Sequence, residues 1–255
     1  MKKTFVHNWG NYPVIEADVH SPSFEQDIQA MVQSQETLLA RGNGRCYGDA
    51  ALNPTLFSTH KLNKLLAFDR EKGILTCESG VILSDILDVI VPAGFFLPVT
   101  PGTKFISIGG AIAADVHGKN HHAEGCFSDH LLSFDLVNAA GQIVRCTKED
   151  TPELFWQTVG GMGLTGIIIR ATFNLKPIET AFIRQESIKA QNLQEIMDLF
   201  EESESWTYTM SWIDCLQKGK NIGRSILMRG EHALPNEIPA KASSAPLDLP
   251  KKGKL

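Results

Sequence analysis

Residues 41–48 have the composition of a loop that binds an anion. Glycines at positions 42, 44 and 48 alternate with Arg41 and Arg45. Glycine tolerates positive φ angles, so successive backbone N–H groups can converge on an anion, and the guanidinium groups add positive charge. A phosphate group is the expected ligand. The spacing fits neither a G-x-x-x-x-G-K-[ST] loop nor G-x-G-x-x-G, which would need glycine at Tyr47, so an ordinary surface turn is the alternative.

A second stretch, residues 98–122, combines small residues with polar ones. Gly109 and Gly110 precede the small residues 111–114, where the backbone can closely approach a flat or charged ligand. The imidazole, ammonium and amide groups that follow are expected at the edge of that ligand. This polar cluster consists of Asp115, His117, Lys119, Asn120, His121 and His122.

Neither the histidines nor the cysteines predict a metal site. The histidines show no H-x-x-x-H or H-E-x-x-H spacing, and a hydrogen bond to a neighbouring carbonyl is the ordinary role for His121 and His122. The five cysteines are widely spaced and include no C-x-x-C pair, which favours reduced thiols. Cys46 lies inside the first glycine loop, where a small packed side chain is the simplest interpretation.

Alternating apolar patterns predict the elements that position these stretches. Strands are expected at 14–19, 37–40 and 167–175, and hairpins at 61–79 and 131–146. Helices are expected from a capping box at Ser23, and at 84–91 and 153–158. Glycine-bearing loops at 41–48, 101–110 and 160–166 each adjoin a strand, so we expect them to converge on one extended ligand such as a dinucleotide. Strands and helices do not alternate strictly, which predicts an α+β fold.

The C-terminal third predicts half of an antiparallel sheet with one helix. Strands are expected at 182–188, 206–214 and 224–229, and a helix at 193–200. Residues 235–255 are rich in Pro, Ser, Ala and Lys, which is typical of a linker or disordered tail.

Composition narrows the class of protein. The 255 residues are 43% apolar and 21% charged, as in ordinary globular proteins. The net charge of −5 and the lack of a basic run argue against nucleic acid or an anionic membrane surface as a partner. No apolar run approaches the ~18 residues of a spanning helix, and no signal-peptide core follows Met1, so a cytoplasmic location is expected.

Four segments resemble the FAD-binding domain of the vanillyl-alcohol-oxidase (PCMH) type of flavoprotein, and within it the oxidases of decaprenylphosphoryl-ribose. The segments are RGNGRCYGDAALN, PGTKFISIGGAIAADVHGKNHH, HLLSFDLVNAAGQIV and ELFWQTVGGMGLTGIIIRAT. The resemblance extends from about residue 9 to the C-terminus. It implies a two-lobed FAD-binding domain at 1–178, with lobes of about 1–70 and 71–178, and a partial antiparallel-sheet substrate domain at 179–234.

The resemblance also implies roles for individual residues. It places the pyrophosphate at the first glycine loop, and the strand end at 114–117 beneath the isoalloxazine. It gives Ile167 a main-chain contact near the adenine half. It makes His117 and Lys119 the catalytic residues on the substrate side of the flavin. The implied cofactor-binding residues are Arg41, Gly42, Asn43, Gly44, Arg45, Cys46, Tyr47, Gly48, Asp49, Ala50, Gly102, Ser107, Ile108, Gly109, Gly110, Ala114, Asp115, Val116, His117 and Ile167.

The implied reaction is hydride transfer from a sugar CH–OH group to flavin. The implied substrate is a sugar or lipid-linked sugar such as decaprenylphosphoryl-ribose, a cell-envelope precursor, and a reductase or epimerase is the implied partner. Some relatives attach FAD through a histidine in the first glycine loop, where this chain has Arg45 and Cys46, so a non-covalent flavin is expected.

The family's oxidases continue past residue 255 and supply further flavin-facing groups, including a lysine. We therefore expect an open sheet edge and a homodimer. The alternatives are an oxidase of the aldonolactone or alditol type, and a flavin-binding or vestigial module that needs a partner chain.

Overall fold

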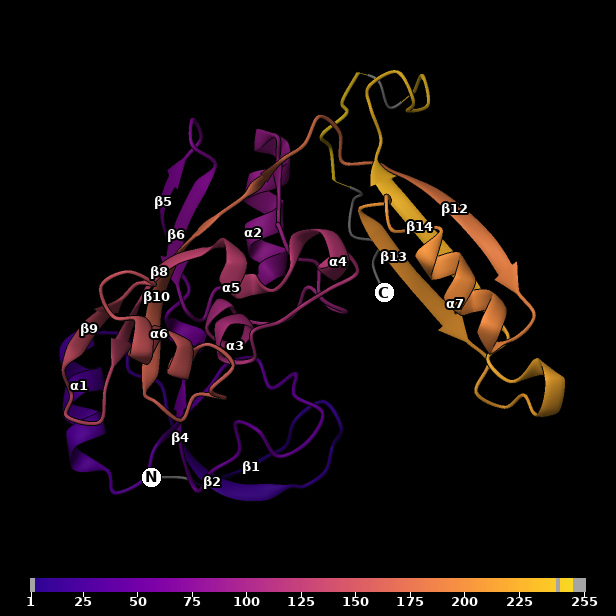
Figure 1. The fold of residues 1–255 in the computed structure, drawn as a ribbon. Helices are drawn as coiled ribbons and strands as arrows, with labels where there is room; N and C mark the ends of the chain where they lie inside the picture. Colours follow the sequence, from indigo (N-terminus) through magenta and orange to yellow (C-terminus); the bar gives the residue numbers. More distant parts are fainter. Residues whose placement is uncertain (1–2, 242–243, 250–255) are drawn as a thin grey trace. The chain divides into compact units, whose positions relative to one another are not determined.

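The computed structural model describes residues 3–241 and 244–249 (Figure 1). The α+β chain forms two compact units. The first contains Met1–Leu87, Thr103–Val116 and Phe127–Leu175, and the second contains Asp88–Gly102, His117–Cys126 and Lys176–Leu255. This division differs from a linear boundary at residue 178, because two internal segments group with the later strands.

A small mixed sheet begins the first unit. Its order is β1-β2-β4-β3, with β1 antiparallel to β2 and both β2 and β3 parallel to β4. Helix α1 connects β2 to β3 and buries Ile28. The helix is preceded by Phe24, with no side-chain cap, so the capping box expected at Ser23 is wrong: the helix begins too late for Ser23 to reach its free N–H groups. The elements are β1 (Thr4–Val6), β2 (Ile15–His20), α1 (Glu25–Ser34), β3 (Leu39–Arg41) and β4 (Thr55–Ser58).

A five-stranded antiparallel sheet forms the rest of this unit's core. Its order is β5-β6-β10-β8-β9, and both predicted hairpins are confirmed. Ile167 and Ile169 of β10 pack in one apolar cluster with Ile28 and Phe57, which joins the two sheets. The strands are β5 (Leu65–Asp69), β6 (Ile74–Glu78), β8 (Leu131–Val137), β9 (Ile143–Cys146) and β10 (Ile167–Asn174).

Short helices connect these strands. The helix at 84–91 is confirmed, and 108–113 forms a helix that the sequence did not predict. Residues 114–117 lie in a turn and coil after it, so the expected strand end there is wrong: Ala114 N–H still donates to Gly110 O (3.1 Å) and closes the helix. The helices are α2 (Leu83–Ile90), α3 (Ile108–Ala113), α5 (Phe127–His130) and α6 (Pro152–Thr158), with 3-10 turns at Thr59–Lys61 and Val91–Ala93.

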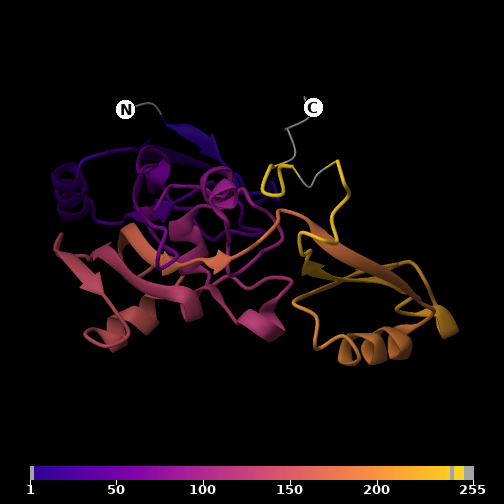
Figure 2. The same ribbon diagram turned by 90° about the horizontal axis from the view of Figure 1, so that it is seen from above.

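The second unit contains the predicted antiparallel sheet with its helix. Its strand order is β12-β14-β13, and α7 covers one face of the sheet (Figure 2). Ile196 of this helix packs with Ala190 and Leu227. A separate pair joins β7 to β11. The elements are β7 (Phe95–Phe96), α4 (His121–Glu124), β11 (Lys176–Pro177), β12 (Ile183–Ala190), α7 (Leu193–Glu201), β13 (Tyr208–Ile213), a 3-10 turn (Gly219–Asn221) and β14 (Ser225–His232).

The expected tail at 235–255 is partly tied to this sheet. Ala181 N–H donates to Pro246 O (2.7 Å), and Arg184 pairs with Glu237 (3.4 Å). Residues 242–243 and 250–255 lie outside the described residues. Among residues 3–241 and 244–249, no helix has the length and apolar character needed to cross a membrane.

Candidate functional site

A cavity of about 470 Å³ opens in the first unit where three glycine-bearing segments meet. Its volume is in the range of small-molecule and cofactor sites, ~300–1,000 Å³. The segments come from residues 40–51, 106–116 and 162–168, so the loops expected to converge do so. The lining residues are Ala40, Gly42, Asn43, Gly44, Arg45, Cys46, Tyr47, Gly48, Asp49, Ala50, Ala51, Thr59, Ile106, Ser107, Gly109, Gly110, Ala113, Ala114, Val116, Met162, Gly163, Gly166 and Ile168.

The first loop presents its backbone N–H groups without protein partners. Across the described part of the chain, no N–H of residues 43–49 donates a hydrogen bond to another protein group. Gly44 has φ +59, a left-handed conformation that glycine adopts without strain. A Cβ added to Gly48 would meet no protein atom within 4 Å, although Gly48 lines the cavity. Unpaired N–H groups and a close backbone approach are the features of an anion nest.

The two arginines of this loop have different positions. Arg41 does not line the cavity: its guanidinium donates to Asn8 Oδ1 (2.5 Å), His7 O (2.6 Å) and Ala51 O (3.1 Å). Burial lowers the pKa of Arg41 from its ordinary value. Arg45 is exposed and lines the cavity, with one hydrogen bond to Asn43 O (2.9 Å). Arg45 is therefore the guanidinium placed to neutralise an anion there, and Arg41 holds the loop.

Cys46 lines the cavity but is not activated as a nucleophile. Burial raises the pKa of its thiol, against the opposing effect of the Arg41 charge. Since the thiolate is the reactive form, a protonated Cys46 does not favour a covalent bond to a ligand.

The second and third segments form one continuous wall. Gly109 N–H donates to Ser79 O (2.7 Å), and a Cβ on Gly109 would lie 3.1 Å from Ser79 Cβ. Helix α3 therefore packs closely against Ser79, the residue directly after β6. At the other end of α3, Met162 N–H donates to Ala113 O (2.8 Å) and Gly160 N–H donates to Ile112 O (3.1 Å). The third glycine loop is thereby fixed to the end of α3.

The side chains of three residues that the resemblance assigned to the cofactor have other surroundings than the cavity. Asp115, with φ +39, accepts from Ser128 N–H (2.9 Å) and Ser128 Oγ–H (3.0 Å), and so fixes the start of α5. The side chains of Ile108 and Ile167 are buried in the core. None of the three lines the cavity, although Gly166 and Ile168 on either side of Ile167 do.

Gly102, His117 and Lys119 belong to the second unit. Lys119 is held there by its backbone, which donates to Thr100 O (3.2 Å) and accepts from Thr209 N–H (2.8 Å). Its Nζ lies 3.4 Å from Pro101 O, and the ring of His117 lies 5.7 Å from that of His121. Among the residues that the structure describes, no cluster of three or more His, Cys, Asp or Glu is arranged to hold a metal.

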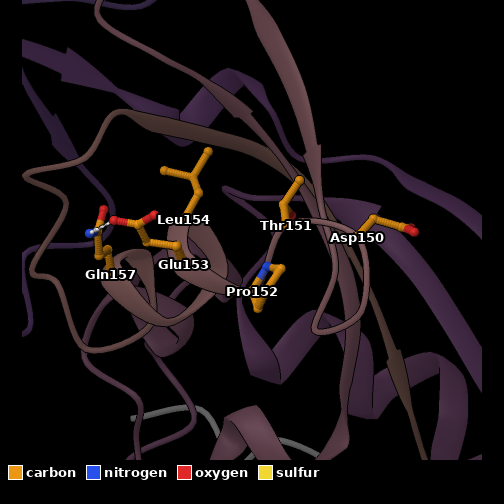
Figure 3. Close-up of a pocket in the computed structure, with 6 residues that line it drawn as sticks. All are labelled: Asp150, Thr151, Pro152, Glu153, Leu154 and Gln157. Carbon is orange, nitrogen blue, oxygen red and sulfur yellow. Dashed lines mark hydrogen bonds between the residues drawn. The ribbon is translucent and has the colours of Figure 1, made fainter.

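A second hollow, of about 500 Å³, lies along α6 (Figure 3). It is lined by Asp150, Thr151, Pro152, Glu153, Leu154 and Gln157, and Gln157 Nε2 donates to Glu153 Oε1 (3.2 Å). Its two carboxylates would repel an anion, and the cavity between the glycine segments is the better-founded site.

Sequence reasoning missed several apolar lining residues and one polar support. In the sequence, apolar residues that line a cavity look like apolar residues of the core. Gly163 and Gly166 lie in the glycine-bearing loop at 160–166, but were not named individually as site residues. Asn8, which is 2% exposed, is hydrogen-bonded to Arg41, 33 residues further along the chain, and to Gly48. No local sequence pattern indicates these contacts. The missed lining residues are Ala40, Ala51, Thr59, Ile106, Ala113, Met162, Gly163, Gly166 and Ile168.

Known proteins are similar to this chain over half of its length or more. The decaprenylphosphoryl-beta-D-ribose oxidase of Mycolicibacterium smegmatis is 35% identical, over 94% of this chain and 54% of that protein. The L-gulonolactone oxidase of Scyliorhinus torazame is 24% identical, over 70% of this chain and 42% of that protein. The D-lactate dehydrogenase of Anaerostipes hadrus is 30% identical, over 50% of this chain and 28% of that protein. The chain spans about half the length of these relatives, or less.

A family match covers two of the three segments that line the cavity. The FAD binding domain family matches residues 19–147, half of the chain, which include the anion nest and the wall formed by α3. The match and the cavity together establish that this chain belongs to the FAD binding domain family, whose cofactor is FAD.

Proposed function

We propose that the protein is an FAD-dependent oxidoreductase that oxidises a CH–OH group of a sugar or sugar derivative, with non-covalent flavin. The observation that carries this proposal is the nest of unpaired N–H groups at residues 43–49, which line the cavity. The sequence similarity to a sugar oxidase, which covers 94% of this chain, supports it.

The residues present fit FAD. The nest suits a diphosphate, Arg45 adds a positive charge, and the absent Cβ of Gly48 leaves room for close approach. Apolar side chains such as Ile106, Val116 and Ile168 suit a flat ring system. When bound, FAD supplies hydride acceptance, which no side chain provides. The protonated thiol of Cys46 supports a non-covalent cofactor.

His117 and Lys119 are the proposed catalytic residues. Oxidation of CH–OH releases a proton as well as a hydride, and a neutral imidazole is a suitable base for that proton. A lysine ammonium donates hydrogen bonds to sugar oxygens and stabilises developing negative charge. His117 directly follows Val116, which lines the cavity, and Lys119 comes two residues after His117.

The proposed substrate class is a lipid-linked or otherwise activated sugar such as decaprenylphosphoryl-ribose, by similarity to the Mycolicibacterium smegmatis oxidase. A reductase that completes an epimerisation is the corresponding partner. Similarity to L-gulonolactone oxidase supports an aldonolactone as the second candidate substrate.

The test begins with the purified chain, incubated with FAD and freed of excess by gel filtration. We expect the visible flavin bands to stay with the protein, and acid precipitation to leave a colourless pellet and a yellow supernatant. Absence of flavin after gel filtration would refute the proposal, and a yellow pellet would refute the non-covalent part.

Anaerobic addition of a ribosyl phospholipid, and separately of an aldonolactone, should then distinguish the substrates by bleaching of the flavin bands. Retained flavin with no bleaching by either would favour a flavin-binding module that needs a partner chain.

A further inference from the structure

A short segment ahead of the family match supports the anion nest from outside the cavity. We define residues 7–9 as the N-terminal clasp. The clasp lies outside residues 19–147, and its contacts reach a loop 33 to 42 residues further along the chain. Such contacts are features of the tertiary fold and leave no local sequence pattern.

Asn8 is the centre of the clasp. Its side chain is 2% exposed, and Nδ2 donates to Gly48 O (2.7 Å) and Ala50 O (2.5 Å). Its Oδ1 accepts from Arg41 Nη1 (2.5 Å). Two carbonyl acceptors and one guanidinium donor fix the orientation of this amide, because the flipped amide would face each partner with a group of the wrong kind.

Two more contacts complete the clasp. Trp9 N–H donates to Cys46 O (3.1 Å), and the Trp9 ring meets the Tyr47 ring edge to face at 5.4 Å. Arg41 Nη2 donates to His7 O (2.6 Å). The clasp therefore holds the carbonyl oxygens of Cys46, Gly48 and Ala50.

The geometry of the peptide bond converts these carbonyl contacts into an orientation of N–H groups. In a trans peptide the C=O of one residue and the N–H of the next lie in one plane and point in opposite directions. When the clasp holds the carbonyls of Cys46 and Gly48, it turns the N–H groups of Tyr47 and Asp49 away from itself. Both residues line the cavity, and neither N–H has a protein partner in the described part of the chain.

We propose that Asn8 is a positioning residue that orients the amide of Asp49 as a hydrogen-bond donor to the diphosphate of the cofactor, with Arg41 as its fixed partner, while the Trp9 N–H of the same clasp orients the amide of Tyr47. This inference rests on the proposed flavin site and extends it to a residue outside the matched domain. Asn8 does not touch the ligand and acts through the loop.

The main experiment compares Asn8→Ala with the parent chain for three ligands: FAD, ADP and riboflavin. FAD and ADP carry the diphosphate, and riboflavin lacks it. We expect the Kd of the variant for FAD and for ADP to rise about tenfold or more, since Gly48 and Ala50 lose a shared donor. The Kd for riboflavin should stay within about twofold, which a general disturbance of the cavity would not allow.

The matched control is Asn138→Ala, in the turn between β8 and β9 of the same unit. Asn138 Oδ1 also binds two backbone groups, accepting from Ala140 N–H (3.0 Å) and Gln142 N–H (3.0 Å), but lies outside the cavity lining. This control should leave all three Kd values within about twofold.

A second variant and a variant-free measurement cover the case in which Asn8→Ala fails to fold. Arg41→Lys keeps the charge but loses the planar fork that binds Asn8 and His7, and should raise the Kd for ADP in the same way. In the parent chain, hydrogen exchange at the amides of Tyr47 and Asp49 should slow on addition of ADP, while that of Ala139 should not change.

The outcomes separate the two proposals. If the parent chain binds neither FAD nor ADP, the proposed function fails. If the parent binds both, the positioning role of Asn8 is overturned by an unchanged Kd for ADP in a folded Asn8→Ala variant, by an equal loss of riboflavin affinity, or by unprotected Tyr47 and Asp49 amides.

Discussion

Filling the cavity at Gly48 should remove FAD binding without harming the fold. A Cβ at Gly48 would meet no protein atom within 4 Å, and Gly48 is not among the residues with positive φ. In Gly48→Leu the new Cβ therefore has no protein neighbour to displace, and the backbone has no positive φ to strain it. It would occupy space beside the anion nest.

The expected magnitudes follow from these two facts. A hydrogen bond to a charged group contributes ~1.5–3 kcal/mol, so a diphosphate pushed away from two nest N–H groups loses ~3–6 kcal/mol. This corresponds to a rise in the Kd for FAD of about 10² to 10⁴. The free energy of unfolding should be unchanged or higher by ~0.4–1 kcal/mol, because replacing glycine restricts the unfolded chain.

The assay is a pair of measurements on each protein: FAD affinity by flavin fluorescence and the free energy of unfolding in urea. Ala139→Leu is the control, since it adds a similar side chain to an exposed turn outside the cavity lining and should keep the parent's affinity. Gly44 would be a poor choice, because its φ is +59 and an added Cβ would contact the Arg41 guanidinium. A Gly48→Leu protein that binds FAD as the parent does would refute the assignment of the diphosphate to this loop.

Two further predictions concern residues that support the fold. Asp115→Ala should lower the free energy of unfolding, measured in urea, by ~1–3 kcal/mol, because two hydrogen bonds to Ser128 are lost. The control Glu149→Ala, at an exposed position, should change it little. Equal effects of the two substitutions would contradict the structural role of Asp115. Burial lowers the pKa of His232 below its ordinary value of about 6.5. The neutral ring, hydrogen-bonded to Tyr208 Oη (3.1 Å), therefore stabilises the fold above about pH 6.5. This contribution should be lost as the pH falls toward the folded-state pKa. Urea unfolding at about pH 7.5 and about pH 5 should show a smaller pH-dependent loss in His232→Gln than in the parent, and the same loss in both would show that His232 is not responsible.

The glycine loops and the regular strands were accessible from sequence because their signals are local. Alternation of apolar residues and charged turns predicted both hairpins of the five-stranded sheet. Three glycine runs beside strands predicted a common ligand site, and the cavity joins them. The strand after the third run, 167–175, lies within one residue of β10.

Helix α3 and the hydrogen-bond partner of the neighbouring Asp115 could not be predicted from local sequence patterns. Its Gly-Gly pair has low helix propensity, and the helix is stabilised by close packing of Gly109 on Ser79 and by Ser107 Oγ, which accepts from Gly110 N–H (3.3 Å). Asp115 was expected at the ligand's edge from its polar run, and the resemblance placed it beneath the isoalloxazine. In the structure its carboxylate accepts hydrogen bonds from Ser128 of α5, a partner that no local pattern indicates.

The polar cluster at 117–122 and the anion nest are supported by different units of the fold. The polar cluster is held by a later part of the chain, since Lys119 O accepts from Thr209 N–H of β13 and His122 Nε2 lies 2.7 Å from Trp206 O. The anion nest is held by the clasp and Arg41, which belong to the first unit. The chain passes from one unit to the other between Val116 and His117, so neighbours in sequence have separate structural supports. Under the proposed function, affinity for the diphosphate therefore depends on residues of the first unit, and the handling of a substrate proton depends on a segment that groups with the second.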